Sequence, residues 1–286
     1  MQMGVLLGTE AFASTPLLAF AEAMESMGYE SLWVPELFGR EPIATAGFLL
    51  GRTRRLKVAT GIANVYVRDA HAMAQTRQTL AELADGRFML GLGVSNVGLN
   101  SARGHVWQAP FKKMREYLDA MSAADVQSPQ PSVPAPLYIA AHGPKLQALG
   151  ASHADGVITY LMPPAHTQVS RQRIGDSAAL NVVCPLLAET DPAAARDRIR
   201  KQLRYYLTLD YYHREWRKLG FTDADFADGG SDALVDTVVG WGDKAALQAR
   251  VAAYQDAGAT RVIVLPLDVR RSVDESLNTL QALKSR

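Results

Sequence analysis

Three observations in the sequence predict an α/β fold, a (β/α)8 TIM barrel with a helical insertion after its seventh strand. Short apolar segments alternate with amphipathic helical segments, which is typical of repeated βα units and a parallel sheet. Eight such apolar segments fit a barrel better than an open doubly wound sheet, which commonly has about five or six strands. The helical sequence after the seventh segment is longer than one barrel helix needs. We therefore expect a single domain over residues 1–286 that contains an insertion at residues 196–242.

The predicted strands are runs of β-branched, aliphatic and aromatic residues. In chain order they are MGVLLG near Met3, SLWV near Leu32, LKVATG from Leu56, RFMLGLG from Arg87, PLYIAA from Pro136, GVITYL from Gly156, ALNVVCPLL from Ala179 and RVIVLPL from Arg261. The segments between them place apolar residues three or four positions apart, which predicts helices, for example PLLAFAEAMESMG, HAMAQTRQTLAELADG and FKKMREYLDAMSAADV. In such a barrel, functional residues lie where the strands end and the βα loops meet.

The composition argues against several classes of protein. The chain is 48% hydrophobic and 21% charged, and its 30 Lys and Arg residues balance 29 Asp and Glu residues, so no global field attracts nucleic acid or a membrane. The single Cys184 excludes an intrachain disulfide and Cys-based zinc sites, and no histidine pair with a carboxylate has metal-ligand spacing. The N-terminal residues read as neither a signal peptide nor a membrane span. We expect a cytoplasmic protein with a small-molecule partner and no metal.

The third strand breaks its own pattern as it continues into IANVYVRD. Gly61, Ala63 and Asn64 interrupt the apolar run, and a glycine in a strand marks a bulge, a bend or the close approach of a ligand. Because the break falls at the barrel mouth, two interpretations are open. The segment is either a bulge that relieves barrel curvature or a surface that backs a ligand.

The fifth strand runs into a segment that resembles a phosphate site. Small residues with accessible backbone N–H groups precede a proline that suits the first position of a helix, whose N-terminus favours an anion. The alternative is a simple strand-to-helix turn. The residues concerned are Ala140, Ala141, His142, Gly143 and Lys145, of which His142 is also a candidate proton carrier.

The fourth strand ends in GLGVSNVG, which fails two better-known templates. The glycine spacing does not match a dinucleotide fingerprint, and the second glycine of a nucleophile elbow comes one residue late. The small residues around Gly93 leave room for a ring system instead, and Ser95 and Asn96 could bind its polar edge. The alternative is a barrel strand that its glycines weaken.

Glu36, directly after the second strand, is the ionisable residue best placed for chemistry. A carboxylate there could bind a substrate hydroxyl or exchange a proton, or it could simply cap a loop or form a salt bridge. The proton partner is open among Glu36, Tyr66, His105 and His142. The basic and aromatic stretch at residues 204–218 has helical spacing, so we interpret it as a packing helix or substrate lid rather than a nucleic-acid surface.

The order of ATGIANVYVRD, DGRFMLGLGVSN, AAHGPKLQALGASHADG and LGFTDADFADGGSDALVDTVVGWGD resembles the luciferase-like monooxygenase superfamily, and within it the coenzyme F420-dependent oxidoreductases of actinobacterial type. The resemblance implies a flavin-shaped ring across the barrel mouth, with the bulge, including a non-prolyl cis peptide at Gly61-Ile62, behind one face. It places the cofactor phosphate near Ala140, Ala141 and Gly143. It also implies a homodimer.

The resemblance predicts hydride transfer between the deazaflavin C5 and a small organic substrate. Some relatives have a histidine directly after the acid, where this chain has Leu37, which puts a sugar-phosphate substrate in doubt. Two alternatives remain open: an FMN-dependent monooxygenase that uses dioxygen, and a barrel that binds a phosphorylated ligand without turnover. The predicted cofactor contacts are Gly61, Ile62, Ala63, Asn64, Gly93, Ser95, Asn96, Ala140, Ala141, Gly143 and Lys145, and the predicted catalytic residues are Glu36 and His142.

Overall fold

The computed structural model describes residues 2–10, 12–37, 39–267 and 273–284. All eight predicted strands are present, together with two strands of two residues each that the sequence did not predict, β4 and β9. The described strands are β1 (Gln2–Leu6), β2 (Ser31–Val34), β3 (Lys57–Thr60), β4 (Ala63–Asn64), β5 (Phe88–Gly93), β6 (Leu137–Ala140), β7 (Gly156–Tyr160), β8 (Ala179–Leu187), β9 (Gly240–Trp241) and β10 (Arg261–Pro266).

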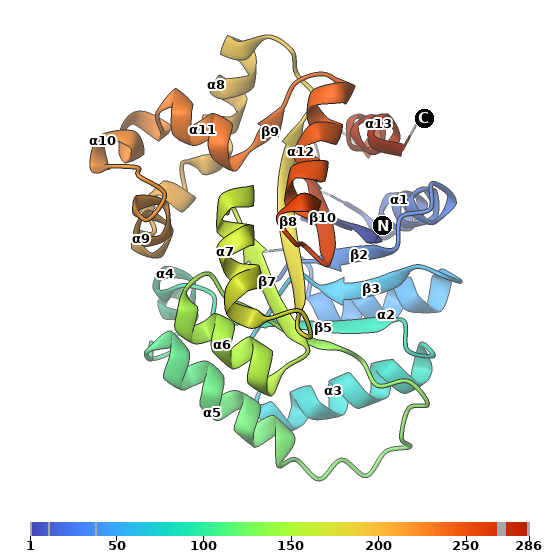
Figure 1. Cartoon of the computed structure of the whole chain (residues 1–286). Coiled ribbons are helices and arrows are strands. Elements are labelled where there is room, and N and C mark those ends of the chain that lie inside the picture. Colours follow the sequence, from blue (N-terminus) through green and yellow to red (C-terminus); the bar gives the residue numbers. More distant parts are fainter. Residues whose placement is uncertain (1, 11, 38, 268–272, 285–286) are drawn as a thin grey trace.

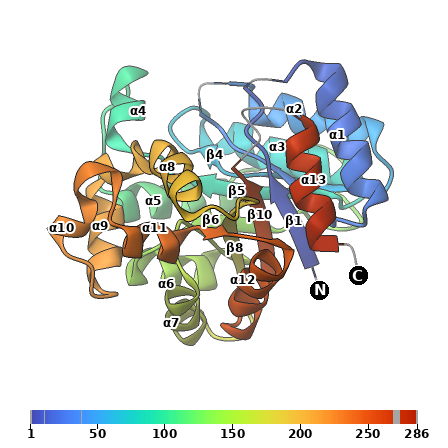
Figure 2. The ribbon, with the colours of Figure 1, turned by 90° about the horizontal axis from the view of Figure 1, so that it is seen from above.

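The strands form the predicted closed barrel. Neighbouring strands pair in parallel in the order β1, β2, β3, β5, β6, β7, β8 and β10, and β10 also pairs with β1, which closes the sheet. Helices lie around the outside of the barrel in both views (Figure 1 and Figure 2). The (β/α)8 prediction is therefore confirmed.

The described helices cover the strands in sequence order, and α1 and α13 lie side by side (Figure 2). The three helical segments predicted by their spacing correspond to α1, α3 and α5. The full set is α1 (Ser14–Ser26), α2 (Pro42–Arg52), α3 (Ala70–Leu83), α4 (Val97–Ala102), α5 (Pro110–Ser122), α6 (Pro144–His153), α7 (Pro164–Ile174), α8 (Pro192–Leu203), η1 (Tyr206–Thr208), α9 (Asp210–Arg217), α10 (Asp223–Phe226), η2 (Ala227–Gly229), α11 (Asp232–Val238), α12 (Lys244–Asp256) and α13 (Val273–Lys284). Within these described residues, no helix is long and apolar enough to span a membrane.

The apolar core of the barrel has two parts that the barrel wall separates, and a third apolar cluster lies in the insertion. The larger part lies between the strands and the surrounding helices, and it includes the buried thiol of Cys184. The smaller part fills the barrel, where Trp33 stacks on Tyr138 with ring centroids 6.1 Å apart. Its buried members are Leu6, Trp33, Ala59, Met89, Tyr138, Ile158, Val183 and Ile263. A packed interior of this kind leaves the strand ends as the place for a site.

The N-terminal end of the barrel is closed by a buried ion pair. Arg261, at the start of β10, donates from Nε to Glu30 Oε2 at 2.9 Å and from Nη1 to Asn181 Oδ1 at 2.6 Å. The charge and hydrogen bonds of the pair stabilise that end of the barrel. The opposite end, where β2, β3, β5, β6 and β7 finish, is therefore the mouth.

Helices α8 to α11 and β9 come between β8 and α12, where the sequence predicts an insertion. These helices gather on one side of the barrel (Figure 2). They share an apolar cluster centred on the fully buried Trp216, and it also includes Leu161 and Met162 from the end of β7. The indole Nε1 of Trp216 donates to the Leu161 carbonyl at 3.0 Å, so α9 is tied to the mouth.

Candidate active site at the barrel mouth

The interrupted third strand is a β-bulge. Ala59 lies opposite Met89 and Ala63 lies opposite Leu92, so three residues, 60–62, stand against two, 90–91. One extra residue in one strand of a pair defines a bulge. The strand therefore resumes as β4 after the bulge rather than ending at Thr60.

The Thr60 side chain replaces the strand hydrogen bonds that the bulge removes. Its hydroxyl donates to the Gly91 carbonyl at 2.6 Å and accepts from the Gly91 N–H at 2.9 Å. On the other side, the Gly61 N–H donates to the Val34 carbonyl at 2.7 Å. The bulge is thus held by β5 and β2 together, which satisfies its buried backbone groups.

The glycines of β5 are required by the bulge. A Cβ at Gly91 would lie far inside contact distance of the Thr60 carbonyl oxygen, and a Cβ at Gly93 would meet the Ile62 side chain. Ile62 itself packs on the cluster inside the barrel. The missing side chain at Gly93 therefore lets Ile62 lie at the top of the barrel interior, on the mouth.

One expectation for the bulge is wrong. None of the peptide bonds in the described ranges is cis, so the bond Gly61-Ile62 is trans. The physical reason is visible in the pairing: one inserted residue and the Thr60 hydroxyl already accommodate the bend, and Gly61 provides the space beside Pro35 and Leu6.

Glu36 lies directly after β2 and is held by fixed donors. Its Oε2 accepts from the Asn64 N–H at 2.7 Å and from Arg68 Nη1 at 2.9 Å, and its Oε1 accepts from Arg68 Nη2 at 3.1 Å. Arg103 Nη1 lies 3.8 Å from Oε1, and only 6% of the Glu36 side chain is exposed. Burial opposes the charge of Arg68, but the hydrogen bonds and charges of Glu36 and of Glu41 together outweigh it and raise the pKa of Arg68. This arrangement favours the salt-bridge interpretation of Glu36, and a proton-transfer role stays a prediction.

A chain of buried amides continues from the bulge to the loop after β5. Asn64 Nδ2 donates to Asn100 Oδ1 at 2.8 Å, and Asn100 Nδ2 donates to the carbonyls of Val94 and Asn96. Asn96 caps α4 through its Oδ1 and donates from Nδ2 to the hydroxyl of Tyr205 at 2.9 Å. The amides of Asn64 and Asn96 are therefore occupied by the protein.

Two residues at strand ends of the mouth have left-handed backbone conformations. Ser95, after β5, has φ of 57°, and Leu161, after β7, has φ of 55°. For residues other than glycine this conformation costs roughly 1 kcal/mol or more and is found mainly where structure enforces it, often at functional sites. Ser95 is half-buried at this strand end.

The segment after β6 forms the opposite half of the mouth. Gly143 is the N-cap of α6, no side chain caps that helix, and Pro144 takes its first turn. Lys145 is exposed in the same turn. The two halves meet at Gly93, because a Cβ at that position would stand 3.4 Å from the Cβ of Ala140. The structure thus brings the predicted ring-side residues and the predicted phosphate residues to one edge of the barrel.

His142 lies in this segment beneath the insertion. Its ring centroid is 5.4 Å from that of Tyr212 and 6.3 Å from that of Tyr211, which it stacks against. Burial, and to a smaller extent the charge of His166, lowers the pKa of His142 to about 3. The ring is therefore neutral near pH 7, where it can hydrogen-bond but carries no extra proton. Its catalytic role stays a prediction.

Two buried polar atoms next to the α6 N-terminus have no hydrogen-bond partner within the described residues, His142 Nδ1 and Glu215 Oε2. Buried polar atoms are nearly always paired, so such atoms indicate a ligand or water. They occur where the sequence predicts the cofactor's tail. The residues present therefore fit a polar tail at this point.

Tyr66 and His105, the other proton candidates, belong to a separate cluster. Their rings are 5.9 Å apart, and Tyr66 stacks on Trp107 with centroids 5.8 Å apart. The Tyr66 hydroxyl accepts from the Gln108 N–H at 2.9 Å. This cluster fixes the loop between α4 and α5. Sequence reasoning missed Arg68, Asn100, Tyr205 and Glu215, because their spacing along the chain gives no sign of the partners that the fold provides.

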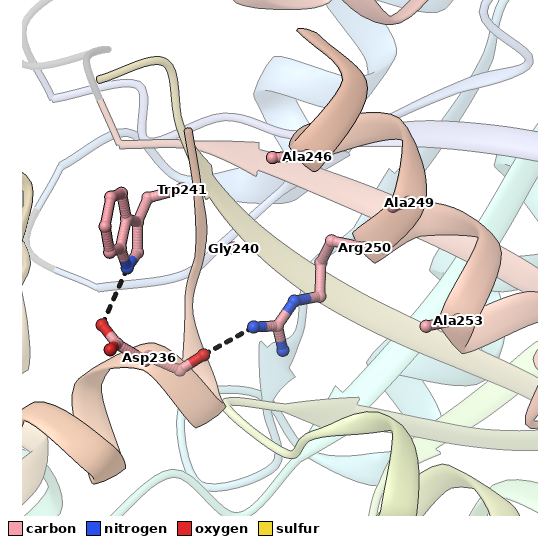
Figure 3. A pocket seen from close by; sticks show the side chains of 7 residues that line it. All are labelled: Asp236, Gly240, Trp241, Ala246, Ala249, Arg250 and Ala253. Carbon is pink, nitrogen blue, oxygen red and sulfur yellow. Dashed lines mark hydrogen bonds between the residues drawn. The ribbon is translucent and has the colours of Figure 1, made fainter. Parts of the chain in front are cut away.

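A shallow, open groove of about 410 Å³ lies elsewhere, on the outside of the barrel between β9 and α12 (Figure 3). Its charged groups are already engaged: Asp236 accepts from Trp241 Nε1 at 2.8 Å, and Arg250 donates to backbone carbonyls at the end of α11. The alanines of α12 line the rest, as Figure 3 shows. The groove is thus a packing feature away from the strand ends.

Comparison with known proteins agrees with the fold and the motifs. The family described as luciferase-like monooxygenase matches residues 1–261. A 5,10-methylenetetrahydromethanopterin reductase of Methanolobus tindarius is 26% identical over 60% of this chain and 59% of its own length. A Mycobacterium tuberculosis protein named for coenzyme F420-dependent oxidoreduction is 22% identical over 92% of this chain and 94% of its own. The chain thus spans little more than half the length of the methanopterin reductases that it matches.

Among solved structures, an F420-dependent secondary alcohol dehydrogenase in complex with an F420-acetone adduct superposes with a TM-score of 0.76. The match covers 99% of both chains at 18% sequence identity. Likeness at this identity establishes the shared barrel and no more.

Proposed function

Because the chain belongs to the luciferase-like monooxygenase family, we propose that it is a coenzyme F420-dependent oxidoreductase that transfers a hydride between the deazaflavin and a small organic substrate. The full-length relative named for coenzyme F420 supports this cofactor over FMN. The chain is an enzyme of a family whose members carry out redox chemistry on a bound ring system.

The bulge at residues 60–62 is the observation that carries the proposal. It is anchored on both sides, and it holds Ile62 at the top of the barrel interior against Gly93. An aliphatic side chain on a rigid backbone is a suitable support for one face of a flat ring, because its position does not depend on the ligand. Gly61, Ala63, Asn64, Ser95 and Asn96 are the other residues proposed to contact the ring or its edge.

The tail of the cofactor is proposed to lie along residues 140–145. Ala140, Ala141 and Gly143 offer backbone without bulky side chains, α6 directs its N-terminus at the tail, and Lys145 adds a positive charge. The unpartnered atoms of His142 and Glu215 lie beside this path. A ring at the bulge and a tail at α6 would then share the edge where Gly93 meets Ala140.

When bound, the deazaflavin supplies the hydride chemistry at its C5. The protein's contribution is to orient the substrate above the ring and to keep water out. Tyr160 and Tyr206 pack edge to face with centroids 5.2 Å apart, and they link the mouth to the insertion as an aromatic wall. Glu36 maintains the bulge in this scheme, because its carboxylate accepts from the Asn64 N–H and its own N–H donates to the Ile62 carbonyl, while Arg68 holds the carboxylate in place.

The substrate is proposed to be a small neutral carbonyl or alcohol rather than a sugar phosphate. Leu37 replaces the histidine that some relatives place after the acid, and the cations nearest to Glu36, Arg68 and Arg103, are already paired with it. Neither arginine is therefore free to bind a substrate phosphate. The aromatic wall of Tyr160 and Tyr206 instead suits an apolar substrate.

Cofactor titration tests the proposal. The purified protein is expected to bind F420 with at least about tenfold higher affinity than FMN, measured by fluorescence. It is also expected to oxidise or reduce a member of a panel of enones, ketones, aldehydes and alcohols, with a matching change in the deazaflavin absorbance. Tight FMN binding with dioxygen-dependent turnover would instead identify an FMN-dependent monooxygenase. The predicted homodimer is checked separately by sedimentation.

A further inference from the structure

The insertion places one tyrosine hydroxyl against the loop after β5. Tyr205, between α8 and η1, accepts a hydrogen bond from Asn96 Nδ2 at 2.9 Å, although 109 residues separate the two in the sequence. Asn96 is buried, whereas Tyr205 is 44% exposed. Asn96 is among the residues proposed to contact the ring or its edge. The Tyr205 hydroxyl therefore lies beside the proposed position of the ring.

The side-chain amide of Asn96 has a fixed orientation. Its Oδ1 accepts from the Leu99 N–H at 3.0 Å, and because a backbone N–H can only donate, the other end of the amide must be the donor Nδ2. The loop around it is also held, since Asn100 Nδ2 donates to the Asn96 carbonyl at 3.0 Å. The cap of α4 thus fixes the direction of the bond to Tyr205, in which the phenol oxygen accepts.

The hydroxyl hydrogen of Tyr205 is left for another acceptor. In the part of the chain that the structure describes, the bond from Asn96 is the only hydrogen bond of this hydroxyl. A phenol that accepts from an amide keeps its own hydrogen, which it can donate to a ligand oxygen. The amide also stabilises the phenolate that forms when the hydrogen leaves, because a hydrogen bond to the charged form favours that form.

The proton candidates identified from the sequence are less well suited to donate at the mouth. Both carboxylate oxygens of Glu36 accept from Arg68, and little of the Glu36 side chain is exposed. His142 carries no extra proton near neutral pH, because burial lowers its pKa to about 3. Tyr66 is bonded to the loop between α4 and α5. The reduction of a carbonyl still needs a proton, and Tyr205 has one available.

Resting on the proposed function, we infer that Tyr205 is a catalytic residue that donates this proton to the substrate oxygen, and that Asn96 is a positioning residue that directs the hydroxyl hydrogen to the substrate. In carbonyl reduction, the carbon forms a bond to the hydride, the π electron pair moves to the oxygen, and the oxygen takes the proton as the O–H bond of Tyr205 breaks. The phenolate regains a proton from solvent, to which Tyr205 is exposed. Alcohol oxidation uses the same groups in reverse.

Binding without turnover is the first test. With oxidised F420 bound, Tyr205→Phe should bind cyclohexanone about fivefold more weakly than the wild type, because one hydrogen bond to its oxygen is lost. Methylenecyclohexane has the same skeleton with a CH2 group in place of the oxygen, so the substitution should leave its dissociation constant unchanged. The affinity for F420 itself should stay within about twofold.

The rate of hydride transfer from reduced F420 tests the proton. With cyclohexanone, butanone or benzaldehyde at saturating cofactor, Tyr205→Phe should be about 100-fold slower, which is typical of the loss of a general acid. The wild-type rate should fall by about twofold in D2O, because a proton moves in the same step.

Asn96→Asp separates proton donation from a structural link. Aspartate caps α4 as asparagine does, but it accepts from the Tyr205 hydroxyl and so turns the hydrogen away from the substrate. Proteolysis of residues 204–210 should stay as in the wild type, while hydride transfer should be about tenfold slower or more. Tyr29→Phe is the matched control, because it removes a hydroxyl bonded to the Leu280 carbonyl just before β2, and it should leave binding and rates unchanged.

Each outcome decides. If Tyr205→Phe or Asn96→Asp reduced the three carbonyl compounds as fast as the wild type, or if D2O had no effect, the inference would be overturned and the proposed function would stand. The inference is also overturned if F420 binds and none of the three compounds is reduced. If the wild type does not bind F420, the proposed function fails and the inference fails with it.

Discussion

Alanine at the two glycines of β5 should separate what the bulge needs for folding from what the mouth needs for binding. A Cβ at Gly91 would clash with the carbonyl oxygen of Thr60 and stand 2.9 Å from Ile158 Cδ1, in a region where ordinary Cβ contacts are 3.4–4 Å. The Thr60 backbone cannot move away from such a Cβ as a side chain could, because the Thr60 hydroxyl is hydrogen-bonded to both the N–H and the carbonyl of Gly91. Gly91→Ala should therefore lower the free energy of unfolding by about 3 kcal/mol, the upper part of the range for overpacking.

The same substitution at Gly93 meets a different neighbour. Its Cβ would approach the Ile62 side chain, with Ile62 Cγ1 at 2.9 Å, and a side chain can change rotamer. Gly93→Ala should cost only about 1 kcal/mol of stability, because a rotamer shift is cheap compared with a backbone shift. The displaced Ile62 must move towards the mouth, so F420 binding should weaken by about tenfold or more.

Urea unfolding and cofactor titration of both variants measure these effects. Gly51→Ala on α2 is the control, because a Cβ there has nothing within 4 Å and alanine favours a helix, so stability should be unchanged or rise by up to about 1 kcal/mol. If Gly91→Ala were as stable as the wild type, the account of the bulge would be refuted. If Gly93→Ala bound F420 normally, Ile62 would not support the ring.

Three further predictions concern groups around the mouth. Glu36→Gln should lower the free energy of unfolding by about 2 kcal/mol, because it removes the buried carboxylate that accepts two hydrogen bonds from Arg68 and leaves the half-buried Arg68 paired with Glu41, and urea titration at neutral pH measures it. The folded-state pKa of His142, about 3, lies below that of an unfolded histidine, so the unfolded chain binds more protons in acid. The free energy of unfolding should therefore fall as the pH drops from about 6.5 towards 3, by up to about 1.4 kcal/mol per pH unit. His142→Phe should flatten that slope in unfolding curves measured across this pH range, and an unchanged slope would contradict the prediction. Tyr205→Phe removes the hydroxyl that accepts from Asn96, which should lower the free energy of unfolding by about 1 kcal/mol and speed proteolysis of residues 204–210. An identical digestion pattern would argue against a hydrogen-bonded link between the insertion and the loop after β5.

The barrel was predictable because its strands are buried on both faces and read as continuous apolar runs of sufficient length. ALNVVCPLL and RVIVLPL illustrate this, and both correspond to strands within a residue or two of the expected bounds. Strands β4 and β9 have two residues each, too few for any periodicity. They exist because the bulge returns the chain to β5 in one case and the insertion returns it to β8 in the other.

The site was predictable in position but not in pairing. Strand ends identify which residues reach the mouth, so Glu36 and His142 could be selected from the sequence. Their surroundings depend on residues distant in sequence: Arg68 is 32 residues from Glu36, and Tyr212 covers His142 only because the insertion folds back on the barrel. Burial and ion pairing set the protonation of both groups, and neither is visible in a local motif.

The glycines of β5, which the sequence singled out in the fourth predicted strand, serve packing around the bulge. Gly91 is explained by the Thr60 carbonyl, and Gly93 by the Ile62 side chain, so neither requires a ligand. What packing does not explain is why an isoleucine should be held at the open end of a filled barrel, half-buried, by a bulge anchored on two strands. Under the proposed function, support for a flat ring gives that arrangement a physical purpose, and Ile62, rather than the glycines around it, is the residue of the bulge whose substitution we expect to weaken cofactor binding most.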